Sequence, residues 1–230
     1  MTFKEYKTDD FFAVYKPKGP TSHDIIQEIR RMTGIRKVGH AGTLDPLASG
    51  VLVIGLGREA TKNLKTAVEA EKEYVALIKL GMESATDDEE GKKITNAKVL
   101  IPPIKKIKDI ILKKFIGKIE QTPPVFSAVK ISGKRAYKFA RAGKEIFLKP
   151  RPVEIKNIKI LKYKWPFLKI KAVTGPGVYI RSLARDIGRE LKTGGYLAEL
   201  ERTRVGRFSK KNAIKVNSRF LAARDKKLNQ

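Results

Sequence analysis

The stretch GHAGTLDPLASGVL (residues 39–52) combines a glycine-rich loop, a lone acid and the start of an apolar run. Asp45 and Pro46 form the centre of a predicted turn, in which the carboxylate accepts backbone hydrogen bonds and the proline fixes the bend. The apolar residues that follow, through Gly57, predict a strand. This pattern fits a structural turn as well as a reactive carboxylate, so the rest of the chain must decide the role of Asp45.

The chain around this loop is strongly basic. It has 230 residues with 50 lysines and arginines against 24 acids, a formal net charge of +26. This excess indicates a polyanionic partner, nucleic acid first and an anionic membrane surface second, although a lysine-rich genome would explain part of it. The apolar runs are too short to span a membrane, and the N-terminus has no apolar export signal. We therefore expect a cytoplasmic protein without a membrane partner.

The residue inventory narrows the chemistry. The chain has no cysteine and only two histidines, His23 and His40, which excludes disulfides, thiolate metal sites and a histidine-rich zinc site. The segment GLGREA (55–60) lacks the full glycine spacing of a dinucleotide fingerprint, and no phosphate-loop motif occurs. We therefore expect no metal and no cofactor.

Strand and helix patterns alternate along the chain. Thr21 and Asp24 predict the start of a helix that Gly34 ends, and residues 82–93 form the one acidic patch, a predicted solvated hairpin or loop. The interleaving predicts an α+β fold with a mixed, largely antiparallel central sheet flanked by helices. Strands are expected at 11–16, 50–57, 73–81 and within 153–173, and helices at 59–68, after Pro103 with Ile104, Ile107, Ile111 and Phe115 on one face, and at 179–192.

Residues 122–151 carry a dense run of basic and aromatic side chains. From Lys130 to Arg151 there are eight basic residues and one acid, with aromatic residues interleaved. Cations neutralise phosphates while aromatic rings stack on bases, so the segment predicts an RNA-gripping arm. The alternative is an ordinary helix from Lys134 to Ala142 with a solvated basic face.

Six motifs in a fixed order resemble those of the tRNA pseudouridine-55 synthases of the TruB family. They are KPKGPTSHD (16–24), GHAGTLDPLASGVL (39–52), KEYVALIKLG (72–81), PPVFSAVKISGKRAYKFARAG (123–143), GVYIRSLARDIG (177–188) and LERTRVGRFS (200–209). The resemblance implies the pseudouridine synthase fold with a basic active-site cleft. It also implies a cofactor-free isomerase that flips one uridine, at position 55 in the T-loop of tRNA, and converts it to pseudouridine.

The resemblance also implies roles for individual residues. Asp45 is the catalytic carboxylate, which either attacks the sugar carbon or removes a proton from the sugar. Tyr74 packs against the flipped base, Arg181 pairs with the carboxylate, and His40 fills the stack that the uridine leaves. The other implied substrate-binding residues are Lys16, Pro17, Tyr179, Leu200, Lys130, Arg135, Tyr137 and Arg141.

We expect one catalytic domain, residues 1–209, with the arm at 122–151. A basic tail, 210–230, follows, with no separate C-terminal RNA-binding domain. The expected partner is the T-arm stem-loop of tRNA, and no obligate protein partner is inferred. Two alternatives stay open: a synthase of this family that modifies another RNA, and an RNA-binding protein without catalysis.

Overall fold

The computed structural model describes residues 10–95, 99–127, 129–131, 133–136, 139 and 146–216, with only the backbone of Lys130, Ile131, Lys134 and Arg135. The chain divides into two compact units: unit one, Met1–Tyr74 with Leu200–Gln230, and unit two, Val75–Glu199. Among the described residues, no helix is long and apolar enough to cross a membrane.

Unit one contains the strands paired in the order β14-β1-β3-β12, with β12 contributing its residues from Leu200 onward. The central strand β3 pairs antiparallel with β1 and β2 and parallel with the end of β12, where Leu200 lies opposite Ala48. A short strand, β14, pairs parallel with β1, and β13 pairs with β12. The strands are β1 (Phe11–Lys16), β2 (Val38–Ala41), β3 (Ala48–Leu56), β12 (Gly195–Val205), β13 (Phe208–Ser209) and β14 (Ile214–Lys215).

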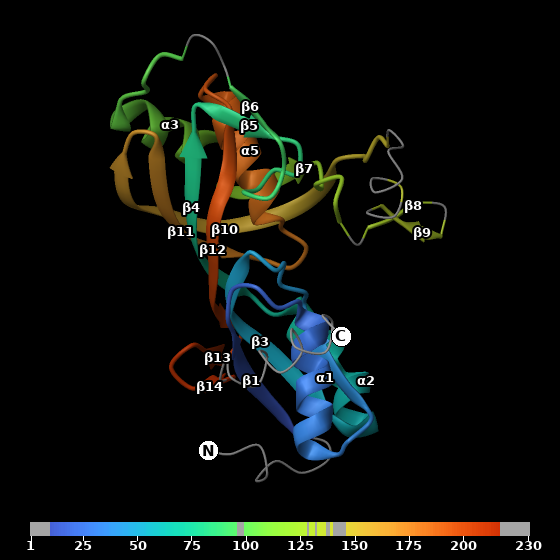
Figure 1. Ribbon diagram of the computed structural model, residues 1–230. Helices are drawn as coiled ribbons and strands as arrows, with labels where there is room; N and C mark the ends of the chain where they lie inside the picture. The colour runs from blue at the N-terminus through green and yellow to red at the C-terminus, as the bar shows by residue number, and fades with distance from the viewer. Residues whose placement is uncertain are drawn as a thin grey trace, which may run out of the picture. The chain divides into compact units, whose positions relative to one another are not determined.

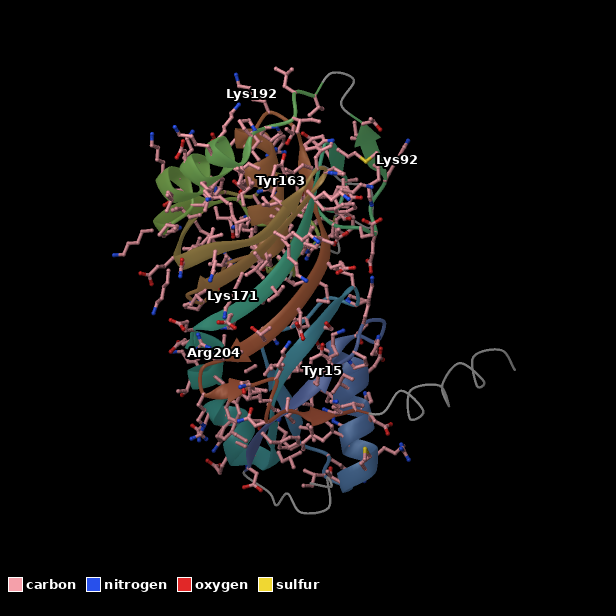
Figure 2. The ribbon with its side chains drawn as sticks, turned by 90° about the vertical axis from the view of Figure 1, so that its left-hand side faces the viewer. Tyr15, Lys92, Tyr163, Lys171, Lys192 and Arg204 are labelled. Atoms are coloured by element: carbon pink, nitrogen blue, oxygen red, sulfur yellow. The ribbon has the colours of Figure 1, made fainter. Side chains whose placement is uncertain are left out.

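Two helices, α1 (Ser22–Thr33) and α2 (Gly57–Glu69), cover opposite faces of this sheet, as Figure 2 shows. Successive strand residues point to opposite faces, so one apolar strand supplies both interfaces. Leu52 and Ile54 pack with Ile25 of α1, whereas Val51 and Val53 pack with Leu64 of α2. This explains why β3 is a nearly continuous apolar run. Val216, just after β14, is buried in the α1 cluster.

The ends of α1 follow the predicted signals. The Thr21 hydroxyl accepts a hydrogen bond from the Asp24 amide (3.1 Å), and the Asp24 carboxylate accepts one from the Thr21 amide (3.0 Å). This reciprocal pair satisfies two backbone donors that would otherwise lack partners. Gly34 ends the helix in the left-handed conformation with φ 72°. The predicted start and end of this helix are confirmed.

Unit two contains strands in the order β12-β4-β11-β10-β7, of which the β7–β10 and β10–β11 pairs are antiparallel (Figure 1). The helices α3 and α5 pack against it through Ile107, Ile111, Leu183 and Ile187, all buried. The elements are β4 (Lys72–Leu80), β5 (Met82–Ser84), β6 (Lys93–Thr95), α3 (Ile104–Lys114), β7 (Gly117–Gln121), β8 (Lys130–Ile131), β9 (Lys134–Arg135), β10 (Arg151–Lys164), β11 (Phe167–Thr174) and α5 (Ile180–Glu190).

The predicted α+β class, with mixed, mostly antiparallel pairing and flanking helices, is confirmed. On the expected apolar face of α3, Ile107, Ile111 and Phe115 are buried, whereas Ile104 is 39% exposed. Ile104 is the first residue of α3, so its side chain lies at the end of the apolar stripe. The first turn of a helix contacts less of the sheet than the turns that follow.

Gly50 tests how closely β3 and β12 approach. Its φ is +118°, and a β-carbon there would lie 2.2 Å from the carbonyl oxygen of Arg202. We expect Gly50→Ala to lower the free energy of unfolding by about 3 kcal/mol or more, because two backbones must move apart. The matched control is Gly34→Ala, which has φ +72° and open space, and it should cost about 1–2 kcal/mol. Equal losses in urea unfolding would contradict the close-approach argument.

Candidate active site

The Asp45 loop connects β2 to β3 in unit one, and its backbone is fixed at several points. The buried Ser22 hydroxyl accepts a hydrogen bond from the Leu44 amide (2.8 Å) and donates one to the Leu44 carbonyl (2.9 Å). On the other side, the Ala48 amide donates to the Asp45 carbonyl at 3.0 Å. The half-buried Asp45 side chain therefore projects from a loop that is anchored before and after it.

Lys16, at the end of β1, is fully buried near this loop. Its ammonium donates to the carbonyls of Pro17 (2.9 Å) and Pro20 (2.8 Å). Burial lowers the pKa of Lys16 to about 8, and attraction by the Asp45 carboxylate opposes that shift. Lys16 and Asp45 are therefore close enough to interact electrostatically.

Arg202 on β12 holds the other end of the loop. The residue is 2% exposed, and its guanidinium donates to the carbonyls of Val51 (2.8 Å) and Gly42 (2.9 Å). This arginine is not among the predicted site residues, although it lies within the LERTR motif. Its partners lie about 150 residues away along the chain, and no local pattern indicates them.

Lys72, at the start of β4, is a second buried lysine that the sequence analysis missed. Its ammonium donates to the carbonyls of Val68 (2.6 Å) and Ala70 (2.8 Å), at the end of α2. Burial, with repulsion from Arg202, lowers the pKa of Lys72 to about 8. The Asp45 loop thus lies in a part of unit one that contains three buried cationic side chains.

The other predicted residues of unit one occupy several strands. His40 lies on β2, where burial and then the charge of Arg202 lower its pKa, so its ring is neutral near pH 7. Tyr74 on β4 is buried, and Pro17 is half-buried directly after Lys16. Leu200 is half-buried opposite Ala48, the first residue of β3 after the loop.

Arg181 lies in the first turn of α5, in unit two, and is buried. Its guanidinium donates to the carbonyl of Phe126 at 2.9 Å and forms an ion pair with Asp88 at 3.5 Å. Asp88 is 3% exposed, so the prediction that residues 82–93 form a merely solvated hairpin is wrong. The hairpin exists as β5 and β6, but its turn carries Asp88 inward to the arginine.

Arg185, one turn further along α5, makes a similar set of contacts. It forms an ion pair with Asp87 (2.8 Å) and donates to the carbonyl of Thr122 (2.8 Å). Burial raises the pKa of Asp87, and the positive charge of Arg185 opposes the shift. The hydroxyl of Ser182 also donates to the Thr122 carbonyl (2.8 Å), so the start of the predicted arm is tied to α5.

Tyr179, directly before α5, is held by its backbone. The Gln121 side-chain amide donates to the Tyr179 carbonyl (3.1 Å) and accepts from its amide (2.8 Å). The guanidinium of Arg151 lies 5.2 Å from the centre of the tyrosine ring, within the range of a cation–π contact.

For the predicted arm, β8 and β9 pair as a short hairpin that contains Lys130 and Arg135. The side chains of both residues, and all of Tyr137 and Arg141, lie outside the described residues. Their predicted contacts with RNA stay predictions. So does the pairing of Asp45 with Arg181, which belong to different units. No group of acids and histidines in the described segments is arranged to hold a metal ion.

Comparison with known proteins gives the family. A sequence model of "TruB family pseudouridylate synthase (N terminal domain)" matches residues 30–180, and one of "tRNA pseudouridylate synthase B C-terminal domain" matches residues 181–224. The chain belongs to the TruB family. Its tRNA pseudouridine synthase B relative from Corynebacterium diphtheriae is 46% identical over 87% of this chain and 69% of the relative. The relative from Clostridium novyi is 41% identical over 94% and 76%.

Solved structures similar to this TruB family member come from larger assemblies. One chain in a crystal structure of a Cbf5-Nop10-Gar1 complex matches with a TM-score of 0.69 and 28% identity, over all of this chain and 62% of that one. A chain of an H/ACA RNP bound to a substrate RNA containing 2′-deoxyuridine matches with a TM-score of 0.66 and 27% identity, over 95% and 55%. The TruB chain therefore spans less than two thirds of these solved chains.

The buried Lys16 predicts a pH-dependent stability. Its folded pKa of about 8 lies below the ordinary value of 10.5. Between these pH values the unfolded chain binds a proton that the folded chain has released, so stability rises with pH. Wild type should therefore gain stability relative to Lys16→Met from pH 8 to 10.5 and show a constant difference below pH 8. Urea unfolding from pH 6.5 to 10.5 measures this.

The exposed neighbour Lys18 provides the control, since Lys18→Met removes the same charge from solvent. The rise in stability with pH should therefore be lost in Lys16→Met and kept in Lys18→Met. A Lys16→Met variant that keeps the full rise would contradict the buried, pKa-shifted ammonium. Lys72 is unchanged in all three proteins, so its own titration cancels.

Proposed function

We propose that this chain isomerises a uridine of tRNA to pseudouridine, and that its target is the T-loop uridine at position 55. Relatives at 41–46% identity carry the name tRNA pseudouridine synthase B. The observation that carries the proposal is the anchored loop that presents Asp45 near the buried ammonium of Lys16. A pure RNA-binding protein has no use for a rigidly held carboxylate that repels phosphate.

The reaction needs no cofactor on chemical grounds. The bond between N1 of uracil and C1′ of the sugar breaks, the base turns, and C5 joins C1′. C5 loses a proton and N1 gains one, so no electrons enter or leave. Asp45 acts on the sugar, either by attacking its carbon or by removing a proton. Cations near a carboxylate favour its charged form, which is the role proposed for Arg181 and is supported by Lys16.

The uridine must leave its stack before it can react, because a paired or stacked base cannot enter a closed site. We assign the vacated position in the stack to His40, whose neutral ring carries no charge into the RNA. Tyr74 provides a buried aromatic surface for the turning base. Lys16, Pro17, Tyr179 and Leu200 complete the proposed pocket, and Lys130, Arg135, Tyr137 and Arg141 the proposed RNA contacts of the arm.

We also propose that residues 1–209 act as the catalytic domain, with the segment 122–151 as an RNA-binding arm and residues 210–230 as a basic extension. The T-arm stem-loop is the proposed recognition element, and the cytoplasm the proposed location. Incubating the protein with unmodified tRNA, and mapping pseudouridine by position, tests the function. Modification of position 55 in tRNA and in an isolated T-arm hairpin supports it. Modification of a different RNA alone would favour another substrate for the same family.

Asp45→Asn tests the carboxylate, because it keeps the shape of the side chain and removes its charge. We expect pseudouridine formation to fall by about 10²–10⁴-fold or more. Affinity for tRNA should hold or rise, since repulsion of phosphate is lost. Asp109→Asn, an exposed acid on α3, is the matched control and should leave the rate unchanged. Substantial turnover in Asp45→Asn would contradict a catalytic role and would indicate that Asp45 only stabilises the turn.

Arg181→Lys tests charge against geometry. Lysine keeps the positive charge but lacks the planar fork that reaches both the Phe126 carbonyl and Asp88. We expect the rate at saturating RNA to fall by about 10–100-fold, the value of lost charge-assisted hydrogen bonds. The same lost bonds should lower the thermal midpoint, but the protein should still unfold in one cooperative transition. Arg189→Lys, an exposed arginine on the same helix, should leave both unchanged. A near-normal rate for Arg181→Lys would show that a point charge suffices.

A further inference from the structure

The hairpin of β10 and β11 in unit two carries an unusual run of charge. From Ile155 to Thr174 the chain has six lysines and no acid. Cross-strand register places Lys162 opposite Lys169, and Lys159 opposite Lys171. The exposed side of this hairpin, hereafter the lysine face, consists of Lys159, Lys162, Lys164, Phe167, Lys169 and Lys171 (Lys171 is labelled in Figure 2).

This arrangement works against folding stability. Like charges directly opposite each other in an antiparallel pair are destabilising, whereas opposite charges stabilise. The neighbouring pair β7–β10 follows the stabilising pattern, because Lys118 lies opposite Glu154. On the lysine face, Lys162 and Lys169 lie opposite each other instead. The sheet therefore carries a cost there that a polyanion bound across both strands would relieve.

An aromatic residue lies at the end of the lysine face. Phe167 is 41% exposed and pairs across the strands with Lys164. The ammonium of Lys79, on β4, is 5.9 Å from the centre of its ring. Exposed aromatic rings beside cations stack on unpaired bases while the cations neutralise the backbone. The combination fits a nucleic acid with a single-stranded part better than it fits a simple counter-ion surface.

The lysine face points away from the helices of unit two. Tyr163 is next to Lys162 on the other side of β10, and its hydroxyl donates to the carbonyl of Pro102, just before α3 (2.8 Å). A β-carbon added to Gly195 would lie 3.3 Å from Leu80 of β4 and 2.9 Å from the carbonyl of Ala184 in α5, so Leu80 is on the α5 side of β4. Lys79 therefore projects to the opposite side. Within unit two, the lysine face is thus separate from the surface where α5 holds Arg181.

We propose that the lysine face is a second RNA-binding surface, which holds the phosphate backbone without reading sequence. The choice of RNA as the polyanion rests on the proposed function, because RNA is the polyanion on which the proposed enzyme acts. Two lysines on neighbouring strands contact phosphates, and Phe167 stacks on an unpaired base at the end of the face. An anionic membrane is the alternative occupant that the experiment must separate.

The test uses Lys159→Glu/Lys169→Glu in the full chain, in which each new acid lies opposite a remaining lysine. Its thermal midpoint should rise, because the like-charge pair of Lys162 and Lys169 becomes an opposite-charge pair. Affinity for a non-substrate RNA duplex with a single-stranded end should fall by about tenfold or more near 0.15 M salt. The slope of log affinity against log salt should become shallower by about 0.7–0.9 for each phosphate that the variant no longer binds. If the lysines of the lysine face had only a structural role, the variant would not combine a higher thermal midpoint with a lower affinity for RNA.

The matched control is Lys105→Glu/Lys108→Glu on α3, which makes the same change of charge in the same unit on the helix side of the sheet. It should retain RNA affinity and the salt slope. An equal loss in this control would show that only net charge matters and would overturn the proposal. So would unchanged RNA affinity in Lys159→Glu/Lys169→Glu, or binding to phosphatidylserine vesicles that depends on these lysines while RNA binding does not.

Two further measurements complete the test. Phe167→Ala should weaken binding of the duplex with a single-stranded end but leave a blunt duplex and the salt slope unchanged. A loss that is equal for both RNAs would contradict base stacking. Pseudouridine formation in a saturating T-arm hairpin should be normal in every lysine-face variant. Binding is measured on a non-substrate RNA and activity on the T-arm hairpin. A chain without isomerase activity could therefore still show RNA binding by the lysine face, and the two proposals can fail independently.

Discussion

The Asp45 loop depends on a buried guanidinium that bonds to backbone carbonyls. Arg202 donates to Gly42 on one side of the loop and to Val51 on the strand after it. A buried cation with no partner would cost several kcal/mol, so these carbonyls must stay in place for the arginine to be tolerated. The constraint is mutual: the loop satisfies Arg202, and Arg202 fixes the loop. Because Arg202 fixes the backbone on both sides of the loop, Asp45 has a defined position although it is not part of a helix or strand.

In unit two, buried arginines also bond to backbone carbonyls, and here the arginines lie on α5. Arg181 and Arg185 on α5 each bond to a carbonyl of residues 122–126 and to one acid of the β5–β6 turn. Residues 122–126 have no ladder of their own, so the arginines supply the hydrogen bonds that strands would otherwise provide. Removing either charge would take the ion-pair partner from one acid of the turn and one hydrogen bond from residues 122–126. Predicted catalytic and structural roles therefore coincide in these side chains.

The sequence predicted what depends on neighbours a few residues apart. The Thr21–Asp24 cap and the Gly34 stop of α1 and the helix expected at 179–192 depend on residues close together in the chain, and the structure contains each of them. Sequence-based prediction failed for side chains whose contact partners lie far away along the chain. Asp88 reads as a solvated acid because its arginine lies 93 positions away, and Arg202 is separated from Gly42 by 160. The motif resemblance predicted Asp45 and Arg181 as site residues. It did not predict the carbonyl of Phe126, to which Arg181 donates a hydrogen bond.

Two groups of lysines in the described part of the chain differ in the electrostatic cost that they carry. Lys16 and Lys72 are buried, and their low pKa values record a cost that their carbonyl partners only partly offset. Lys162 of β10 and Lys169 of β11 are exposed, and there the cost is repulsion between neighbours rather than loss of solvent. Salt screens exposed charges but hardly affects buried ones. Added salt should therefore relieve the strain of the lysine face while leaving the Asp45 loop as it is, so the two electrostatic costs are separable in one protein.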